Sequence, residues 1–206
     1  MKTNIALISS FMDETYPHVG CELNYQKDYE LVIAVMLSAQ TTDIAVNAVT
    51  KVLFAKYNTL EKLANAELND IENIIRTIGL YKNKAKNVIG IAQTLINQYG
   101  GVLPSDKDEL QKLPGVGNKS AGVIRAEVFR IPDLPVDTHI LRISKRLKLA
   151  NDKDGPYETE MKLKKSFPES SWIKIHHQLI HFGRDICVAR NPQCQRCKLT
   201  GICRKI

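Results

Sequence analysis

The stretch Leu113-Pro114-Gly115-Val116-Gly117-Asn118-Lys119 decides the fold prediction, because it breaks the chain sharply between two segments with helical patterning. Ser105 is expected to cap a short helix before it, and Asn118 begins a predicted helix after it. Gly115 and Gly117 permit backbone angles that residues with side chains rarely adopt, and they allow close approach to the backbone. Backbone N–H groups in such a turn, together with a helix N-terminus, can hold a phosphate. A plain helix–helix turn is the simpler interpretation, and the turn alone leaves both open.

Helical patterning extends in both directions from this turn. Apolar residues recur every three to four positions, whereas alternating strand patterns and hairpin dipeptides are nearly absent. The other expected helices cover residues 28–39, 44–57, 59–64, 67–76, 84–99, 136–149, 157–167 and 171–182. The sequence therefore predicts an all-α protein with short connections, and the Pro-rich stretch 132–135 is the candidate boundary between two lobes.

Composition narrows the class of protein. The chain has 206 residues, of which 44% are apolar and 25% charged, a globular composition that excludes a disordered or fibrous chain. The longest uncharged apolar run, residues 31–39, is far too short to span a membrane, and the N-terminus does not resemble a signal peptide. We therefore expect no membrane partner and a cytoplasmic location. The net charge of +7 points to a polyanionic partner such as nucleic acid.

Four of the five cysteines fall in the last 20 residues, with the spacing C-x6-C-x2-C-x5-C. They are Cys187, Cys194, Cys197 and Cys203. Disulfides are rare in the reducing cytosol, so four clustered thiolates indicate a metal, either one zinc ion or a [4Fe-4S] cluster. The spacing does not choose between them. The same region, from Arg184 through Lys205, carries six basic residues and one acid, and Arg190 lies inside the first cysteine loop. Cys21 stands apart and is expected to be a packed core cysteine.

Other polar residues each allow a structural and a functional interpretation. Lys119 is either a solvated lysine or a nucleophile whose proton release is favoured by the positive end of a helix. Asp137 is either a helix N-cap or a buried carboxylate that faces the lysine and assists catalysis. His139 is better explained as a structural or phosphate-facing side chain than as a catalyst. Gln40, between two core helices, either fills space or hydrogen-bonds bases.

Five segments in fixed order carry a resemblance to a known family. They are Ser38-Ala39-Gln40-Thr41-Thr42-Asp43, Gly79-Leu80-Tyr81 with Lys84-Ala85, the hairpin with Lys119, Val136-Asp137-Thr138-His139 with Arg142, and the cysteine cluster. With these segments the chain resembles the endonuclease III family of helix-hairpin-helix DNA glycosylases with an iron–sulfur cluster. The resemblance runs almost end to end, but residues 132–135 differ from the small apolar residues that the family typically has there.

The resemblance implies two helical lobes with a DNA-binding cleft between them. One lobe holds six helices in residues 22–132, with the helix-hairpin-helix near 106–130. The other combines residues 1–21 with 133–206 and contains the cluster loop 187–203. The resemblance also favours [4Fe-4S] over zinc, with all four C-terminal cysteines as ligands. The implied partner is damaged double-stranded DNA, and we expect a monomer that acts in a bacterial-type cytoplasm on nucleoid DNA.

The family's residue roles carry over by position. Lys119 matches the nucleophile that attacks C1′ of a damaged pyrimidine nucleotide and forms a Schiff base, after which β-elimination cuts the strand on the 3′ side. Asp137 matches the carboxylate that assists displacement of the base. Gly115 and Gly117 match the phosphate-gripping hairpin, and Gln40 and Leu80 match the positions that fill the gap left by the extruded base. The cluster is expected to present Arg190 and its neighbours to the DNA backbone, and His139 is expected to contact DNA as well.

Three other protein classes were weighed against this interpretation. A monofunctional adenine glycosylase lacks the lysine at position 119. A binding-only helix-hairpin-helix module needs neither Lys119 nor Asp137. An electron carrier built on the cluster gives no role to the hairpin or to the basic residues. The order of motifs therefore favours a bifunctional glycosylase and lyase.

Overall fold

A computed structural model describes residues 2–204. Met1 and residues 205–206 lie outside the described part of the chain, and so does Lys205 of the basic C-terminal region. Every regular element between residues 2 and 204 is helical, which confirms the all-α prediction. The chain divides into two compact units, one of residues 22–129 and one of residues 1–21 with 130–206. Among the described helices, none is both long and apolar enough to cross a membrane.

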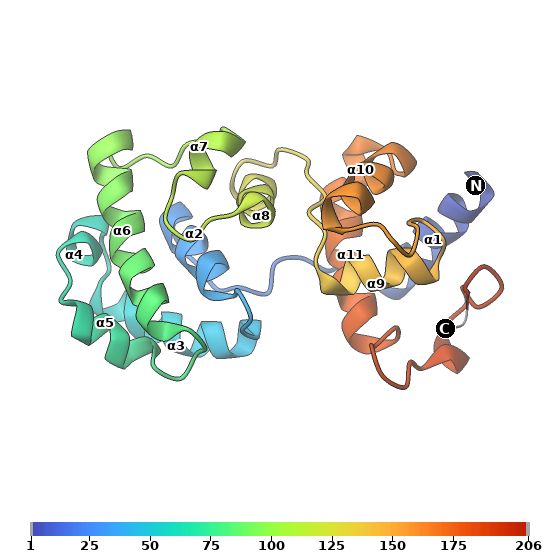
Figure 1. The fold of residues 1–206 in the computed structure, drawn as a ribbon, viewed down its shortest axis with the longest axis horizontal. Helices are drawn as coiled ribbons and strands as arrows, with labels where there is room; N and C mark the ends of the chain where they lie inside the picture. Colours follow the sequence, from blue (N-terminus) through green and yellow to red (C-terminus); the bar gives the residue numbers. More distant parts are fainter. Residues whose placement is uncertain (1, 205–206) are drawn as a thin grey trace. The chain divides into compact units, whose positions relative to one another are not determined.

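The unit of residues 22–129 is built around helix α2 (Asp28–Leu37), in which every residue from Glu30 to Leu37 is buried. A helix that is apolar on all sides has to be surrounded, and α2 contacts α3, α6 and α8. The seven helices of this fully described unit are α2, α3 (Asp43–Lys56), α4 (Leu60–Ala64), α5 (Leu68–Ile75), α6 (Tyr81–Tyr99), α7 (Lys107–Gln111) and α8 (Asn118–Val128) (Figure 1). The resemblance implies six helices here, whereas the structure has seven, of which α4 and α7 have only five residues each.

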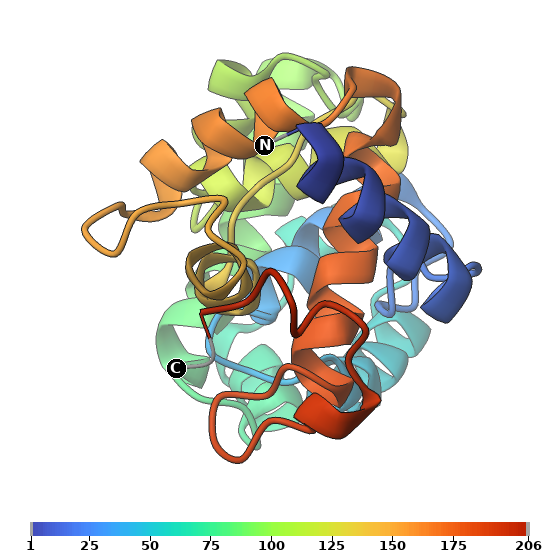
Figure 2. The same ribbon diagram turned by 90° about the vertical axis from the view of Figure 1, so that its right-hand side faces the viewer.

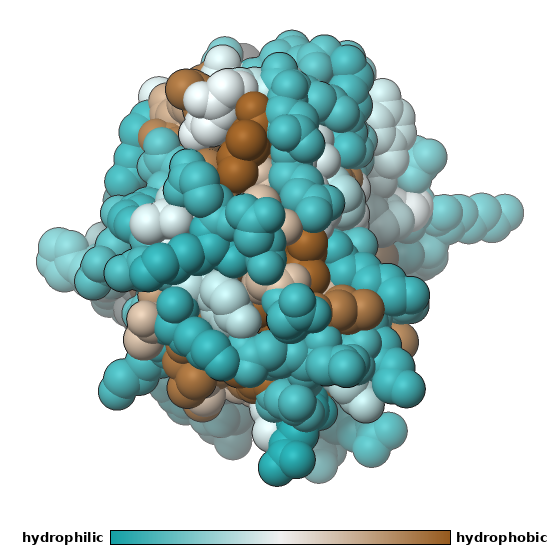
Figure 3. All heavy atoms as spheres, turned by 90° about the vertical axis from the view of Figure 1, so that its left-hand side faces the viewer, coloured by the Kyte–Doolittle hydropathy of each residue, from teal (hydrophilic) through white to brown (hydrophobic). Residues whose placement is uncertain are grey.

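The surface of this unit is mostly polar on the side shown in Figure 3, where hydrophobic patches are small and separate. Large hydrophobic side chains that are nevertheless exposed in this unit include Ile44, Val52, Leu80 and Val102. Scattered apolar residues are ordinary on a protein surface, so exposure alone assigns them no role.

The second unit packs four α-helices: α1 (Lys2–Thr15), α9 (Thr138–Arg146), α10 (Pro156–Ser166) and α11 (Trp172–Asp185). Helix α1 lies along α11, as Figure 2 shows, and Phe11 meets Phe182 edge to face at 5.6 Å between ring centroids. Two short 3-10 helices, Glu169–Ser171 and Cys194–Arg196, complete the unit. Its apolar core joins the N-terminal helix to the C-terminal segment, since Ile8 and Met12 are buried in the same cluster as Leu199.

Several expected helix ends are wrong. Helix α11 continues to Asp185 and not only to residue 182, and three other helices differ as follows. Asp106, and not Ser105, caps α7, because its Oδ1 accepts the N–H groups of Asp108 and Glu109. Helix α6 begins at Tyr81 and not at residue 84, directly after Leu80 in a left-handed conformation. Helix α9 covers Thr138–Arg146 and not 136–149, since Asp137 caps one end and Lys148 adopts a left-handed conformation just past the other.

Candidate active site

The hairpin between α7 and α8 requires glycine at position 115. Gly115 has φ +76°, and a Cβ there would lie 2.5 Å from Asn87 Nδ2 and 2.9 Å from Met36 Cγ. The turn therefore packs tightly against α6 and α2, and both the backbone angle and the space exclude a side chain. Gly117 is different: it has an extended conformation at the N-cap of α8, and a Cβ would meet nothing within 4 Å. The lack of a side chain there leaves the backbone open to another molecule.

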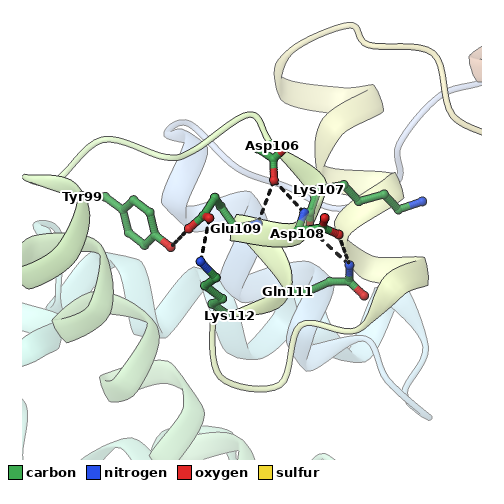
Figure 4. Close-up of polar contacts among 7 residues, drawn as sticks. All are labelled: Tyr99, Asp106, Lys107, Asp108, Glu109, Gln111 and Lys112. Carbon is green, nitrogen blue, oxygen red and sulfur yellow. Dashed lines mark hydrogen bonds and ion pairs between the residues drawn. The ribbon is translucent and has the colours of Figure 1, made fainter.

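Helix α7 is too short to be stable alone, and polar contacts fix it to the end of α6. Tyr99 Oη donates to Glu109 Oε2 at 2.8 Å, and Lys112 Nζ donates to Glu109 Oε1 at 2.6 Å (Figure 4). The bonds from Lys112 and Tyr99 hold the pKa of the Glu109 carboxyl below its ordinary value. Arg125 Nε of α8 also donates to Ser105 O at 3.0 Å, so both arms of the hairpin are held together.

Lys119 is the second residue of α8 and its side chain is exposed. It follows Gly117, the N-cap of α8, by two residues, so it belongs to the first turn of the helix. An exposed amine in this position can reach an electrophilic carbon on a bound molecule.

Gln40 and Leu80 lie in separate loops of the same unit, and a lysine connects these loops. Gln40 has φ 55° and is exposed; Leu80 has φ 59° and is 60% exposed. Lys84 Nζ donates to Ala39 O and to Thr41 Oγ1, both at 2.8 Å, and so grips the loop on either side of Gln40. Positive φ is uncommon for residues with side chains, and such residues concentrate at functional sites.

Asp137 and His139 stand at the start of α9 in the other unit. Asp137 is the N-cap and its Oδ1 accepts the Ile140 N–H at 2.8 Å, so the structural interpretation of this aspartate is correct. His139 Nδ1 lies 3.3 Å from Arg142 Nη2. Arg142 also donates to the carbonyls of Gly183 and Cys187, which ties α9 to the C-terminal end of α11. These contacts fix the direction of the α9 N-terminus.

The four C-terminal cysteines line one pocket, and none of them forms a disulfide. The rest of the lining includes Phe182, Ile186 and Leu147, which are apolar. Burial raises the pKa of the Cys197 thiol, and the three other cysteines raise it further, although the N–H of Leu199 lowers it. In the described residues, no group of three metal-binding side chains stands close enough around one point to hold a single ion. The donor set nevertheless fits a thiolate-bound cluster, because sulfur is the only ligand type among the lining residues and the four sulfurs interact.

Arg146 holds the cysteine loop that carries Arg190. Its Nη1 donates to Cys187 Sγ at 3.3 Å and to Val188 O at 2.9 Å, and its Nη2 donates to Ala189 O at 3.2 Å. Arg190 itself is exposed. The sequence interpretation assigns Arg146 no role. Its spacing of four from Arg142, which places both on one face of α9, is the signal that would have found it.

Three other basic residues of the C-terminal region pair with acids of the same unit. Arg196 Nη1 lies 2.9 Å from Asp185 Oδ1, Arg204 Nη1 lies 2.7 Å from Asp152 Oδ1, and Lys198 pairs with Glu14. The positive charge of this region is therefore partly neutralised within the fold, and Arg190 is a better candidate for an external anion than these three.

Comparisons with known proteins agree with this geometry. A family model described as HhH-GPD superfamily base excision DNA repair protein matches residues 33–169. Endonuclease III from Bacillus subtilis (strain 168) is 46% identical over 192 residues, which cover 93% of this chain and 88% of that protein. Endonuclease III from Escherichia coli (strain K12) is 40% identical over 190 residues, 92% of this chain and 90% of that protein.

Solved structures give the same result. A structure of a trapped endonuclease III–DNA covalent intermediate, in an estranged-adenine complex, superposes with a TM-score of 0.95 at 45% identity and covers 99% of this chain and 96% of that chain. Helical architecture, the glycine hairpin, the cysteine pocket and identity over nearly the whole length point to one family. The chain therefore belongs to the endonuclease III family within the HhH-GPD superfamily of base excision DNA repair proteins, and it is a DNA glycosylase.

Proposed function

We propose that this glycosylase releases oxidised pyrimidines from double-stranded DNA and then cuts the strand on the 3′ side of the abasic site. The observation that carries the proposal is the exposed amine of Lys119 at the start of α8, directly after the glycine hairpin. A solved endonuclease III with this fold is described as a covalent DNA intermediate, which supports a nucleophile on the protein. A monofunctional enzyme would need no such amine.

The reaction proceeds in two stages. The Lys119 Nζ lone pair attacks C1′, the C1′–N bond breaks, and its electron pair leaves with the base, which takes up a proton. Opening of the deoxyribose ring and loss of a proton from nitrogen give a Schiff base. Removal of a proton from C2′ then breaks the bond from C3′ to oxygen and expels the 3′ phosphate, after which water releases the enzyme.

Asp137 is proposed to assist the displacement of the base. The Ile140 N–H bond to Oδ1 orients the carboxylate at the N-terminus of α9. A fixed anion stabilises the positive charge that develops on the sugar as the base departs, and it can accept a proton from the attacking amine. The N-cap bond and the catalytic role are compatible, because a carboxylate has two oxygens.

The remaining site residues are proposed to hold the DNA. A sugar carbon inside a duplex is reached only when the nucleotide is extruded, which costs a few kcal/mol. Gln40 and Leu80 are proposed to fill the resulting gap. The backbone at Gly115 and Gly117, with Arg190 and His139, is proposed to bind phosphates. We place this activity on nucleoid DNA in the cytoplasm and expect the enzyme to act as a monomer.

Cys187, Cys194, Cys197 and Cys203 are proposed to hold a [4Fe-4S] cluster. The four thiols that line one pocket suit either metal site, and the family membership favours the cluster over zinc. Four thiolates bound to the cluster would fix the loop of residues 188–193, and Arg190 with it. The cluster's contribution here is structural, and the chemistry at the sugar depends on the protein's own residues.

The test is product analysis on an end-labelled duplex with one thymine glycol, an oxidised pyrimidine. Free base and a strand cut 3′ of the lesion are expected to form together. Lys119→Ala is expected to lose both products, and Asp137→Asn to slow base release. Base release that leaves an intact, alkali-sensitive strand would show a monofunctional glycosylase. No base release from any oxidised pyrimidine, with binding intact, would refute the substrate assignment.

A further inference from the structure

Lys84 is a buried lysine, with only 4% of its surface exposed. Lysines are rarely buried to this extent, because removing the ammonium from water is costly unless hydrogen bonds replace the hydration. Burial also lowers the pKa of the Lys84 ammonium, in the direction that this cost dictates. A medium-sized apolar side chain would fill the same space at lower cost. The hydrogen bonds that Lys84 makes explain why a lysine is present at this buried position.

The contacts of Lys84 reach the two loops that carry Gln40 and Leu80, the residues proposed to fill the gap in the DNA. Its Nζ donates to Ala39 O and Thr41 Oγ1, the neighbours of Gln40 on either side, at 2.8 Å each. Its backbone N–H donates to the carbonyl of Leu80 at 3.0 Å, one helical turn earlier. One residue thus bonds directly to Leu80 and to both neighbours of Gln40.

Gln40 and Leu80 share an unusual backbone conformation, with φ of 55° and 59°. Residues with side chains keep a positive φ only where the surrounding contacts hold it. The loop around Gln40 has few such contacts of its own. Thr41 N–H donates to Ser38 O at 3.0 Å, Thr41 Oγ1 donates to Ala39 O at 3.4 Å, and Ser38 Oγ donates to Val35 O at 2.8 Å. Lys84 adds two bonds that come from another helix, and these set the position of the loop against α6.

We propose that Lys84 is a positioning residue: its Nζ locks the loop of Gln40 against the start of α6, which directly follows Leu80, so that Gln40 and Leu80 form one preformed wedge that fills the gap left by the extruded nucleotide. This inference rests on the proposed function, because it assumes that these two side chains fill the gap in the DNA. Lys84 acts through Ala39 O and Thr41 Oγ1, and the proposal gives it no contact with the reacting atoms. The wedge is rigid before DNA binds, so DNA need not supply the energy to form it.

The test compares Lys84→Met with Lys86→Met, since Lys86 is an exposed lysine of the same helix. Both substitutions are made in the wild-type protein and in the Gln40→Ala variant. The first readout is the fluorescence of 2-aminopurine opposite a tetrahydrofuran abasic analogue, which reports wedge insertion without any chemistry. The second is single-turnover base release from a thymine glycol duplex. Lys84→Met is expected to weaken the fluorescence change and to slow base release about tenfold to a hundredfold, the loss that a misplacement of about 1 Å produces. Lys86→Met is expected to change neither.

The effect of Lys84→Met in the Gln40→Ala background distinguishes a positioning role from a general loss of structure. If Lys84 acts through Gln40, Lys84→Met costs little more once Gln40 is already alanine. Equal losses in both backgrounds, or a normal fluorescence change in folded Lys84→Met, would overturn the proposal. If Lys84→Met fails to fold, Thr41→Val removes one of its two acceptors from the other side and is expected to show the same coupling at smaller size. Failure of the proposed function has a different signature, because wild type itself would then show no base release.

Discussion

Arg146 donates a hydrogen bond from Nη1 to the sulfur of Cys187, at 3.3 Å. The same guanidinium donates to two carbonyls of the following loop, so the protein holds this segment with its own cation as well as through the cysteines. A hydrogen bond to a thiolate also stabilises its negative charge. Arg146 therefore links helix α9, which Asp137 begins, to the proposed cluster.

Replacement of Arg146 by methionine is expected to loosen the cysteine loop while the helices remain. The variant loses a donor to sulfur and three bonds to carbonyls, each worth about 0.5–3 kcal/mol. We expect faster loss of the visible absorbance of the cluster in air and weaker DNA binding, with unchanged helical circular dichroism. Cluster decay at the wild-type rate would show that the arginine contributes nothing to this loop.

Iron analysis tests the cofactor. Protein purified without oxygen is expected to contain about four iron atoms and about four acid-labile sulfides per chain. Removal of the cluster is expected to weaken DNA binding, because the loop that presents Arg190 then loses its attachment through the cysteines. Hydrogen bonds from Arg142 and Arg146 to the loop backbone remain. One zinc ion per chain, with no labile sulfide, would instead support the four-cysteine zinc site.

The salt dependence of DNA binding distinguishes Arg190 from Arg204. Binding is expected to weaken linearly in log affinity against log salt, because phosphate contacts release counterions. Arg190→Ala is expected to reduce that slope by about one phosphate contact. Arg204→Ala is the matched control, since Arg204 is paired with Asp152 at 2.7 Å. Equal effects of the two changes would mean that Arg190 makes no specific contact.

Lys164 is expected to stabilise the fold through ion pairs with two acids, one of which, Asp133, lies in the segment before Asp137. Its Nζ lies 2.5 Å from Asp133 and 2.6 Å from Glu160, both buried acids. Burial alone lowers the pKa of Lys164, but the bonds to Asp133 and Glu160 raise it above its ordinary value overall. The stability that comes from this raised pKa is present below about pH 10.4, the pKa of an unfolded lysine, and is lost only as the pH rises through the higher folded pKa.

Lys164→Met is therefore expected to lower the free energy of unfolding by about 3–5 kcal/mol at pH 7, since it leaves two acids near each other without their ammonium. The loss is expected to shrink as the pH falls, because protonation of either carboxylate removes the repulsion. Urea unfolding at several pH values measures both effects, and the exposed neighbour Lys165→Met serves as control. A loss that does not vary with pH would contradict the electrostatic origin.

The sequence predicted where the helices lie better than it predicted their first and last residues. Gly100 has φ 60° and ends α6 as expected, because glycine marks a left-handed residue in the sequence. Leu80 and Lys148 adopt the same conformation without any such signal, and the limits of α6 and α9 were missed there. Their neighbours impose the conformation, and local patterns do not reveal those neighbours.

In the candidate site, too, features with a local sequence signal were predicted and features that depend on distant partners were not. Local chemistry predicted the glycine hairpin, the N-cap at Asp137 and the cysteines that share one pocket. The roles of Lys84 and Arg146 depend on partners 41 to 45 residues away in sequence, so no local pattern contains them. The pairing of Lys119 with Asp137 stays a prediction.

The most direct test of the central claim is borohydride trapping. The protein is mixed with a duplex that carries one thymine glycol, and in parallel with one that carries an abasic site, and each mixture is reduced. We expect a covalent protein–DNA adduct on both duplexes that forms with wild type and disappears in Lys119→Ala. An adduct that persists in Lys119→Ala, or no adduct from a wild-type protein that binds both duplexes, would contradict the assignment of Lys119 as the nucleophile.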